Sequence, residues 1–195
     1  GRGHPPPLRR NGAQGKSAVA RPIRGPRVSP LSRRPARPYA GGMSHRILFV
    51  CLGNICRSPT AEAVTRTLAE RAGRPLTLDS AGTGDWHLGA APDPRMQEAA
   101  RAAGYDLSAL RARQVTRDDF HAFDTIYAMD RKNLRDLQAL DPGGGAALRL
   151  FRAHDPQGGP DAQDVPDPYL EGGFDGVLRL IERTAARLLD ELPRG

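Results

Sequence analysis

The chain has 195 residues and a formal net charge of +7, with 38% apolar and 5% aromatic residues. Residues 1–42 contain ten of the 29 Lys and Arg, eight of the 18 prolines and no Asp or Glu, so residues 43–195 carry 19 basic and 22 acidic side chains. This composition excludes a disulfide scaffold, a collagen-like chain and a coiled coil. It predicts a basic, proline-rich arm over 1–42 and one domain of common size over 43–195.

The basic arm, residues 1–42, can be interpreted in three ways. Its arginine-rich, acid-free composition resembles a transit peptide, but eight prolines disfavour the amphipathic helix of such a peptide. It could contact nucleic acid, with Tyr39 as its only aromatic residue to stack on a base. We favour a disordered leader that takes no part in the chemistry of the domain.

Cysteine content and hydropathy bear on the compartment. Cys51 and Cys56 are the only cysteines, and a disulfide between them would close a very small loop and stabilise the fold little. Free thiols in a reducing cytosol are therefore expected. The longest strongly apolar run, residues 47–52, is far shorter than the roughly 20 residues of a membrane helix. We predict a cytoplasmic protein without a membrane anchor.

From residue 46 onward the pattern alternates between strands and helices. A β-rich apolar run at 46–50 is typical of a parallel strand that is buried on both faces. Ser58 is expected as the N-cap and Pro59 as the first residue of the next helix, which Gly73 would end. The elements expected after it are a strand at 75–81, a helix at 93–103, a helical turn with a capping-box-like start at 116–119, a strand at 125–129, a helix capped by Asp130, a strand at 147–151 and an amphipathic helix at 174–192.

This order of elements predicts the fold class. Strands separated by helices imply right-handed crossovers and an open, four-stranded parallel sheet with helices on both faces. Ligands of such sheets bind beyond the carboxyl ends of the strands, at the point where the strand order reverses.

Catalytic chemistry is expected where the first strand ends. Residues 51–58 read Cys-Leu-Gly-Asn-Ile-Cys-Arg-Ser, which places Cys51 between a strand and a helix N-terminus. Gly and Asn tolerate positive φ, so the N–H groups of this loop can turn inward to bind an anion, assisted by the helix dipole. Arg57 offers a planar fork to two phosphate oxygens, and Ser58 offers a hydroxyl to Cys51. The residues predict a nucleophilic thiolate in a phosphate cradle, against the plainer alternative of a buried packing cysteine.

At this point the sequence resembles a known family. Val50-Cys51-Leu52-Gly53-Asn54-Ile55-Cys56-Arg57-Ser58-Pro59 is similar to the phosphate-binding loop of the low-molecular-weight protein tyrosine phosphatases. The resemblance covers residues 45–192 and includes, in the same order, Asp79-Ser80-Ala81-Gly82-Thr83, Asp85-Trp86-His87, Pro92-Asp93-Pro94-Arg95, Ala112-Arg113-Gln114, Met129-Asp130 and Asp167-Pro168-Tyr169.

The resemblance implies a phosphomonoester hydrolase without metal or other cofactor, which acts on phosphotyrosine proteins or small aryl phosphates through a phosphocysteine. It implies Cys51 as the nucleophile, Arg57 as the ligand of the transferred phosphoryl group and Asp167 as the general acid and base, roles that this chemistry requires. The remaining implied roles are the phosphate loop (Leu52, Gly53, Asn54, Ile55, Cys56 and Ser58), support of that loop (Asn54 and Ser80) and the walls of a slot for an aromatic ring (Trp86 and Tyr169).

Without the resemblance, Asp167 is only weakly preferred over its neighbours. Asp155, Asp161 and Asp164 also lie among Pro and Gly, where Asp usually forms turns. An acidic metal site in this loop is disfavoured, because these aspartates lack a regular ligand spacing.

Three positions depart from the pattern of the family. His87 stands where Asn is common, Leu110 stands where a histidine precedes Ala-Arg-Gln, and Leu170 stands where a second aromatic residue often follows Tyr169. We expect Leu170 to loosen selectivity for aryl groups and Leu110 to remove one surface hydrogen bond.

Three other functions compete with this interpretation. Arsenate reduction on the same fold needs further cysteines downstream, and none follows Cys56. Protein-arginine phosphatases favour Thr where Ile55 stands, whereas Ile55 suits an aromatic ring. Nucleic-acid binding through residues 1–42 would weaken steeply with salt. We therefore expect phosphotyrosine-like substrates, and we hypothesise that peroxide reversibly joins Cys51 to Cys56.

Overall fold

Four parallel strands form the centre of the fold. The computed structural model describes Gly1 and residues 45–159 and 163–192, so the predicted arm at 1–42 lies outside the described residues except for Gly1. Strands β1 (His45–Cys51), β2 (Leu76–Gly82), β3 (Thr125–Ala128) and β4 (Ala147–Leu150) pair in the order β2-β1-β3-β4. The strand order reverses beside β1, which places the carboxyl end of β1 where such sheets bind ligands.

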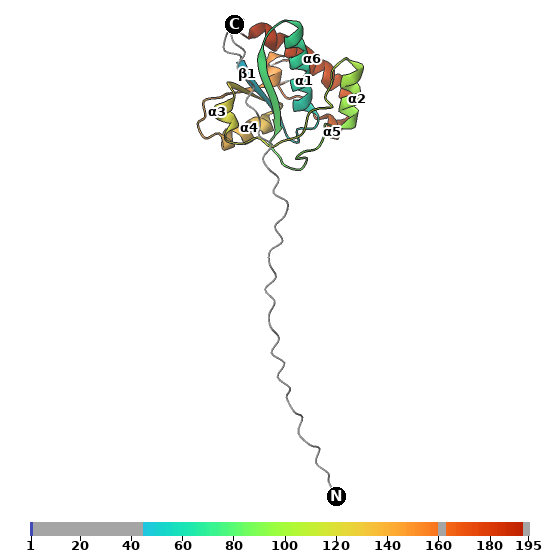
Figure 1. The fold of residues 1–195 in the computed structure, drawn as a ribbon, viewed down its shortest axis with the longest axis vertical. Helices are drawn as coiled ribbons and strands as arrows, with labels where there is room; N and C mark the ends of the chain where they lie inside the picture. The colour runs from blue at the N-terminus through green and yellow to red at the C-terminus, as the bar shows by residue number, and fades with distance from the viewer. Residues whose placement is uncertain (2–44, 160–162, 193–195) are drawn as a thin grey trace. The chain divides into compact units, whose positions relative to one another are not determined.

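Both faces of the sheet are covered by helices, as the sequence predicted (Figure 1). Successive residues of β1 point to opposite faces, and all of residues 47–50 are fully buried. One face packs against α1 (Arg57–Arg71), α2 (Pro94–Ala102) and α6 (Phe174–Glu191), and the other against α3 (Asp119–Ala122) and α4 (Arg131–Leu140).

Most predicted elements are present within one or two residues, and the start of α1 differs from the prediction for a physical reason. Helix α1 begins at Arg57 with Cys56 as its N-cap, so the prediction of Ser58 as the cap was wrong. The Ser58 hydroxyl instead lies 3.1 Å from Cys51 Sγ and accepts a hydrogen bond from Asn54. Pro59 is the third residue of α1, whereas it was predicted as the first; it is tolerated there because the N–H groups of a first helical turn have no partner within the helix.

One later boundary also differs from the prediction, and one later element was not predicted. Strand β4 ends at Leu150, because Phe151 begins the short 3₁₀ helix η1 (Phe151–His154). The loop rich in Gly, Pro and Asp contains an unpredicted helical turn, α5 (Pro168–Glu171), and the Asp167 side chain caps it by accepting from the Tyr169 N–H at 3.2 Å. Within the described residues, no helix combines the length and the apolar character needed to span a membrane.

Candidate active site

Cys51 is the last residue of β1, and its side chain lies at the base of a cleft. The residue is 2% exposed, and its sulfur accepts a hydrogen bond of 3.2 Å from the Asn54 N–H. The sulfur also lies 3.1 Å from Ser58 Oγ in the first turn of α1. The strand and the helix therefore place the thiol beside a backbone N–H donor and a hydroxyl group.

The carbonyl groups of the loop are held by hydrogen bonds from outside it. Four of them accept from neighbouring segments: Cys51 O from Thr83 N–H (2.9 Å), Leu52 O from Gly84 N–H (2.9 Å), Ile55 O from Asp93 N–H (2.8 Å) and Cys56 O from Thr60 N–H (3.2 Å) and Oγ1 (2.7 Å). In a trans peptide the N–H points opposite to the carbonyl of the same unit, and the described residues contain no cis bond. The N–H groups of residues 52, 53, 56 and 57 therefore point away from these anchors, which suits a bound anion.

Asn54 gives the loop its unusual backbone. Its φ is +54°, a value that non-glycine residues seldom adopt. Its side chain donates to Ser58 Oγ (2.9 Å) and to Ser80 Oγ (3.0 Å), and its Oδ1 accepts from the Arg113 N–H (2.9 Å). The structure thus brings Asn54, Ser58 and Ser80 together, and it adds Arg113 as a partner that the sequence did not indicate.

The Arg57 guanidinium is fixed beside the cleft by two carboxylates. Its side chain is 4% exposed, and it donates through Nη1 to Asp130 Oδ2 and through Nη2 to Asp167 Oδ2, each at 2.7 Å. Burial lowers the pKa of Arg57, but the negative charges of Cys51, Asp167 and Asp130 outweigh burial and raise this pKa above its usual value. The arginine therefore stays charged and oriented.

Asp130 is a site residue that the sequence indicated only as a helix cap. Its Oδ1 does cap α4, accepting from the Asn133 N–H at 2.7 Å, while its Oδ2 binds Arg57. Asp130 lies two residues after β3, the neighbour of β1 at the point where the strand order reverses. A carboxylate at that position in the sequence was the signal that could have revealed its second role.

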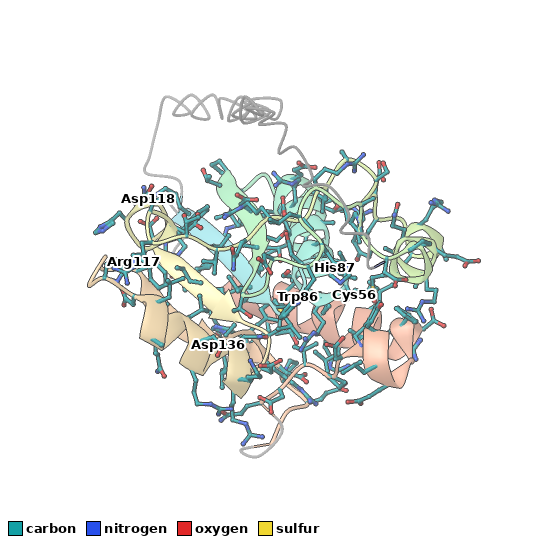
Figure 2. The ribbon with its side chains drawn as sticks, turned by 90° about the horizontal axis from the view of Figure 1, so that it is seen from below. Cys56, Trp86, His87, Arg117, Asp118 and Asp136 are labelled. Carbon is teal, nitrogen blue, oxygen red and sulfur yellow. The ribbon has the colours of Figure 1, made fainter. Side chains whose placement is uncertain are left out.

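The cleft has a volume of about 170 Å³ and opens between two aromatic side chains. The Trp86 ring occupies the space beside Gly84, where a Cβ atom would overlap it, and it is 71% exposed. Tyr169 is 50% exposed and contacts the His87 ring at a centroid distance of 6.2 Å. Figure 2 labels three residues that line the cleft, Cys56, Trp86 and His87. The cleft is lined by Cys51, Leu52, Gly53, Ile55, Cys56, Arg57, Trp86, His87, Asp167, Tyr169 and Leu170.

Cys56 differs from Cys51 in its surroundings, although both are buried and free. Burial, followed by the nearby charges of Asp93 and Cys51, raises the pKa of Cys56 to about 12. Cys56 is therefore a neutral thiol at physiological pH. A reversible disulfide between the two cysteines stays a prediction.

Comparison with known proteins agrees with this geometry. Residues 46–195 match the model of the family described as low molecular weight phosphotyrosine protein phosphatase. The chain is 41% identical to the Bacillus subtilis low molecular weight protein-tyrosine-phosphatase YfkJ over 76% of this chain and 96% of that protein, and it superposes on the YfkJ crystal structure with a TM-score of 0.71.

A yeast protein and a Drosophila crystal structure are also similar to this chain. A Schizosaccharomyces pombe low molecular weight phosphotyrosine protein phosphatase is 47% identical over 67% of this chain and 84% of that protein. The crystal structure of DARP, a Drosophila arginine phosphatase, is 32% identical with a TM-score of 0.68, over 74% of this chain and 95% of that one. The chain belongs to the low molecular weight phosphotyrosine protein phosphatase family.

Proposed function

We propose that this chain hydrolyses phosphotyrosine and aryl phosphate monoesters without a metal ion, through a phosphocysteine formed on Cys51. The observation that carries the proposal is the placement of Cys51 Sγ at the base of a cleft, inside a loop of anchored peptides and beside the fixed cation of Arg57. A phosphate dianion bound there would face inward N–H groups and a guanidinium, which stabilise the charge that develops on its oxygens.

In the first step, the Cys51 sulfur attacks phosphorus and the bond to the ester oxygen breaks. The phosphate draws Arg57 Nη2 away from Asp167, while Asp130 keeps Nη1. Asp167 then loses its cationic partner and is able to hold the proton that the leaving oxygen requires. The arrangement that supports this step is the pair of 2.7 Å contacts, one carboxylate on each terminal nitrogen of Arg57.

In the second step, water attacks the phosphocysteine and releases inorganic phosphate. Asp167 now accepts the proton of that water, which reverses its part in the first step. Ser58 Oγ, 3.1 Å from the sulfur, donates to the thiolate as it leaves. Asp167 thus gives up a proton in the first step and takes one up in the second, while Cys51 forms its bond to phosphorus in the first step and loses it in the second.

Replacement of Cys51 by Ser tests the covalent step. We expect Cys51→Ser to lower kcat for p-nitrophenyl phosphate by on the order of 10⁴-fold or more, because an alcohol at this position is not ionised. Rapid acid quench of the unaltered enzyme with ³²P-labelled substrate should trap one phosphate on Cys51. Unchanged circular dichroism and thermal unfolding would show that the variant is folded. Turnover close to that of the unaltered enzyme would contradict the mechanism.

Phosphoarginine is a second candidate substrate, favoured by the likeness to DARP, the Drosophila arginine phosphatase. Ile55, Trp86 and Tyr169 line the cleft and offer contacts to a flat ring, so we expect phosphotyrosine to be preferred. A panel of otherwise identical phosphotyrosine, phosphoarginine and phosphoserine peptides separates the candidates. A higher kcat/KM for the phosphoarginine peptide would reverse the assignment.

A further inference from the structure

Exposed apolar side chains gather at the mouth of the cleft. Among the described residues, the large apolar side chains that are exposed are Trp86 (71%), Leu88 (59%), Tyr169 (50%) and Leu170 (77%). These four residues, named here the apolar rim, lie on two segments, 86–88 and 169–170. Trp86, Tyr169 and Leu170 line the cleft itself, and Leu88 is two residues from Trp86. A cluster of this kind marks an interaction surface more often than isolated exposed residues do.

The proposed substrate ring accounts for only half of the rim. A phenyl ring that enters the cleft contacts Trp86 and Tyr169, which face it from the two segments. Leu88 lies outside the cleft lining, and Leu170, which lines the cleft, is the most exposed of the four. Both leucines therefore leave apolar surface open to a second contact beside the ring.

The backbone beneath the rim is held in place by hydrogen bonds. The Leu88 N–H donates to Asp85 O at 3.3 Å, and the next N–H, of Gly89, donates to Ala112 O at 2.8 Å. The Leu170 N–H donates to Asp167 O at 3.2 Å within α5. The backbone that carries the leucines is thus ordered before any partner binds, which lowers the entropic cost of binding.

A phosphorylated protein must cross the rim to reach Cys51. Its phosphotyrosine side chain occupies the cleft while its backbone remains at the mouth, and each neighbouring residue is displaced by at most about 3.6 Å along the chain. Residues one or two positions from the phosphotyrosine therefore lie over the rim. Apolar side chains at those positions would remove Leu88 and Leu170 from water.

The charges beside the rim disfavour one class of neighbour. Asp85 precedes Trp86 and Glu171 follows Leu170, and both acidic residues are exposed. Arg95, the cation 5.6 Å from the Tyr169 ring, is already held by the Asp93 carboxylate at 2.8 Å. An acidic residue beside the phosphotyrosine would meet apolar surface and like charge.

From this arrangement we infer that the apolar rim selects phosphotyrosine sites with a large apolar residue one or two positions from the phosphotyrosine, and disfavours sites with acidic neighbours. The inference rests on the proposed function, since it concerns residues that flank the same cleft. Its partner is an extended phosphopeptide with Leu, Met or Phe beside the phosphotyrosine.

The test compares peptides that differ only beside the phosphotyrosine, carrying Leu, Ala or Asp at the flanking positions, with p-nitrophenyl phosphate as a substrate without flanks. We expect kcat/KM to be about tenfold higher for the Leu peptide than for the Asp peptide. The preference for the Leu over the Ala peptide should persist in 0.5 M salt, because burial of apolar surface is not screened, whereas the part of the discrimination against Asp that comes from like charge should weaken. Equal values for the Leu and Ala peptides, or a Leu-to-Ala preference that disappears with salt, would overturn the inference. Failure to hydrolyse p-nitrophenyl phosphate would instead count against the proposed function.

Two substitutions locate the effect. Leu88→Ser should leave p-nitrophenyl phosphate hydrolysis unchanged and reduce the Leu-to-Asp preference, and Leu170→Ser should reduce the same preference further. Leu170→Met, which keeps the apolar area, should retain it. Full preference in both serine variants would overturn the role of the rim. Sedimentation of the full chain tests whether the rim binds a second copy of the chain. A dimer that dissociates in the Leu170→Ser variant would assign the rim to a dimer interface and overturn the inference.

Discussion

Gly82 and Gly84 shape the site through the space that they leave. A Cβ atom on Gly82 would lie 2.7 Å from Leu52 O and 3.2 Å from Asn54 N, so the phosphate loop packs directly against the end of β2. A Cβ atom on Gly84 would overlap the Trp86 ring. The position of Trp86, which lines the cleft, therefore depends on glycine at position 84.

Gly84→Ala should displace Trp86 and so weaken contact with the substrate ring. We expect KM for p-nitrophenyl phosphate to rise about tenfold, with a smaller change in kcat, because the catalytic groups are untouched. Steady-state kinetics and Trp fluorescence measure the two effects. Gly176→Ala in α6 is the matched control, since its Cβ would meet no atom within 4 Å. An unchanged KM in Gly84→Ala would contradict this role of the glycine.

The acid role of Asp167 predicts a dependence on the leaving group. Asp167→Asn should slow cysteine phosphorylation by about 10²–10⁴-fold when the leaving group is a poor one such as phenol, and far less for p-nitrophenol, which departs without a proton. Burst kinetics over a series of substituted phenyl phosphates provide the measurement. Losses of equal size across the series would exclude Asp167 as the proton donor.

Single residues also show how far the sequence could be interpreted. Cys51 and Arg57 were predictable because strand, loop and helix follow one another within a few residues, so local chemistry is enough. Asp130 was underestimated because its partner Arg57 lies 73 residues away, and only the sheet brings them together. Arg113 supports Asn54 through a backbone N–H, which no side-chain pattern reveals.

At the level of elements, the segment that carries Asp167 is anchored by arginines. Arg152 and Arg183 bind the fully buried Asp155 carboxylate at 3.2 and 2.7 Å, and Arg152 also donates to Asp164 O at 2.8 Å. Arg131 at the start of α4 binds the Asp164 carboxylate at 2.9 Å. These ion pairs connect η1, α4 and α6 to the loop before α5.

Asp155→Asn should therefore destabilise the fold by about 3 kcal/mol at neutral pH, since it leaves two partly buried arginines without their carboxylate. The control is Asp136→Asn on the exposed face of α4, where the pair with Lys132 contributes about 0.3–0.5 kcal/mol (Figure 2). Urea unfolding of both variants gives the comparison. Similar losses would show that burial of Asp155 is not decisive.

The same aspartate predicts a pH dependence. Burial raises the pKa of Asp155, but hydrogen bonds from Arg183, Gln157 and Arg152 outweigh it and lower this pKa below its ordinary value. A lowered pKa contributes stability above the unfolded value of about 3.9, and the contribution is lost as the pH falls through the folded value. The difference in unfolding free energy between the unaltered chain and Asp155→Asn should therefore narrow below about pH 4. A constant difference would contradict the assignment.

Elements with a clear hydrophobic pattern in the sequence were predicted, whereas features that depend on contacts with distant segments were not. The strands are short apolar runs bounded by turn residues, and α6 repeats apolar residues at helical spacing, so their existence follows from the sequence. The start of α1 was misplaced because the Ser58 hydroxyl serves the active site instead of the helix end. Helix α5 was missed because a turn that Asp167 caps looks like any Asp-Pro turn in a loop.

For the whole chain, charge is divided unevenly between the predicted arm, residues 1–42, and the predicted catalytic domain, residues 43–195. The positive charge of the chain belongs to residues 1–42, whereas the charge that the proposed reaction needs is local to Arg57 and the loop N–H groups. The strand order could not be predicted, because it depends on how four similar apolar runs pair. The full lining of the cleft could not be predicted either, because it joins segments that range from Cys51 to Leu170.

Deletion of residues 1–42 tests this separation. A chain that starts at Met43 should have the same kcat/KM for p-nitrophenyl phosphate and for a phosphotyrosine peptide, because the proposed site lies within the catalytic domain. Both chains should be compared for retention on heparin over a salt gradient, where only the full chain is expected to bind. A marked loss of activity on deletion would mean that the arm contributes to the site.

The central position of β1 has a consequence for the order in which activity is lost. This strand is paired on both sides and buried on both faces, so its amides should be among the last to exchange with solvent. Asp167 instead lies in the loop beyond the edge strand β4, and we expect this loop to open at lower free energy than β1 in spite of its ion pairs. Mild denaturation should therefore first produce molecules that keep a reactive thiol but lack a proton donor. Alkylation at Cys51 would then persist to higher denaturant concentration than turnover. The difference between the alkylation curve and the activity curve would report the opening of the segment that carries Asp167.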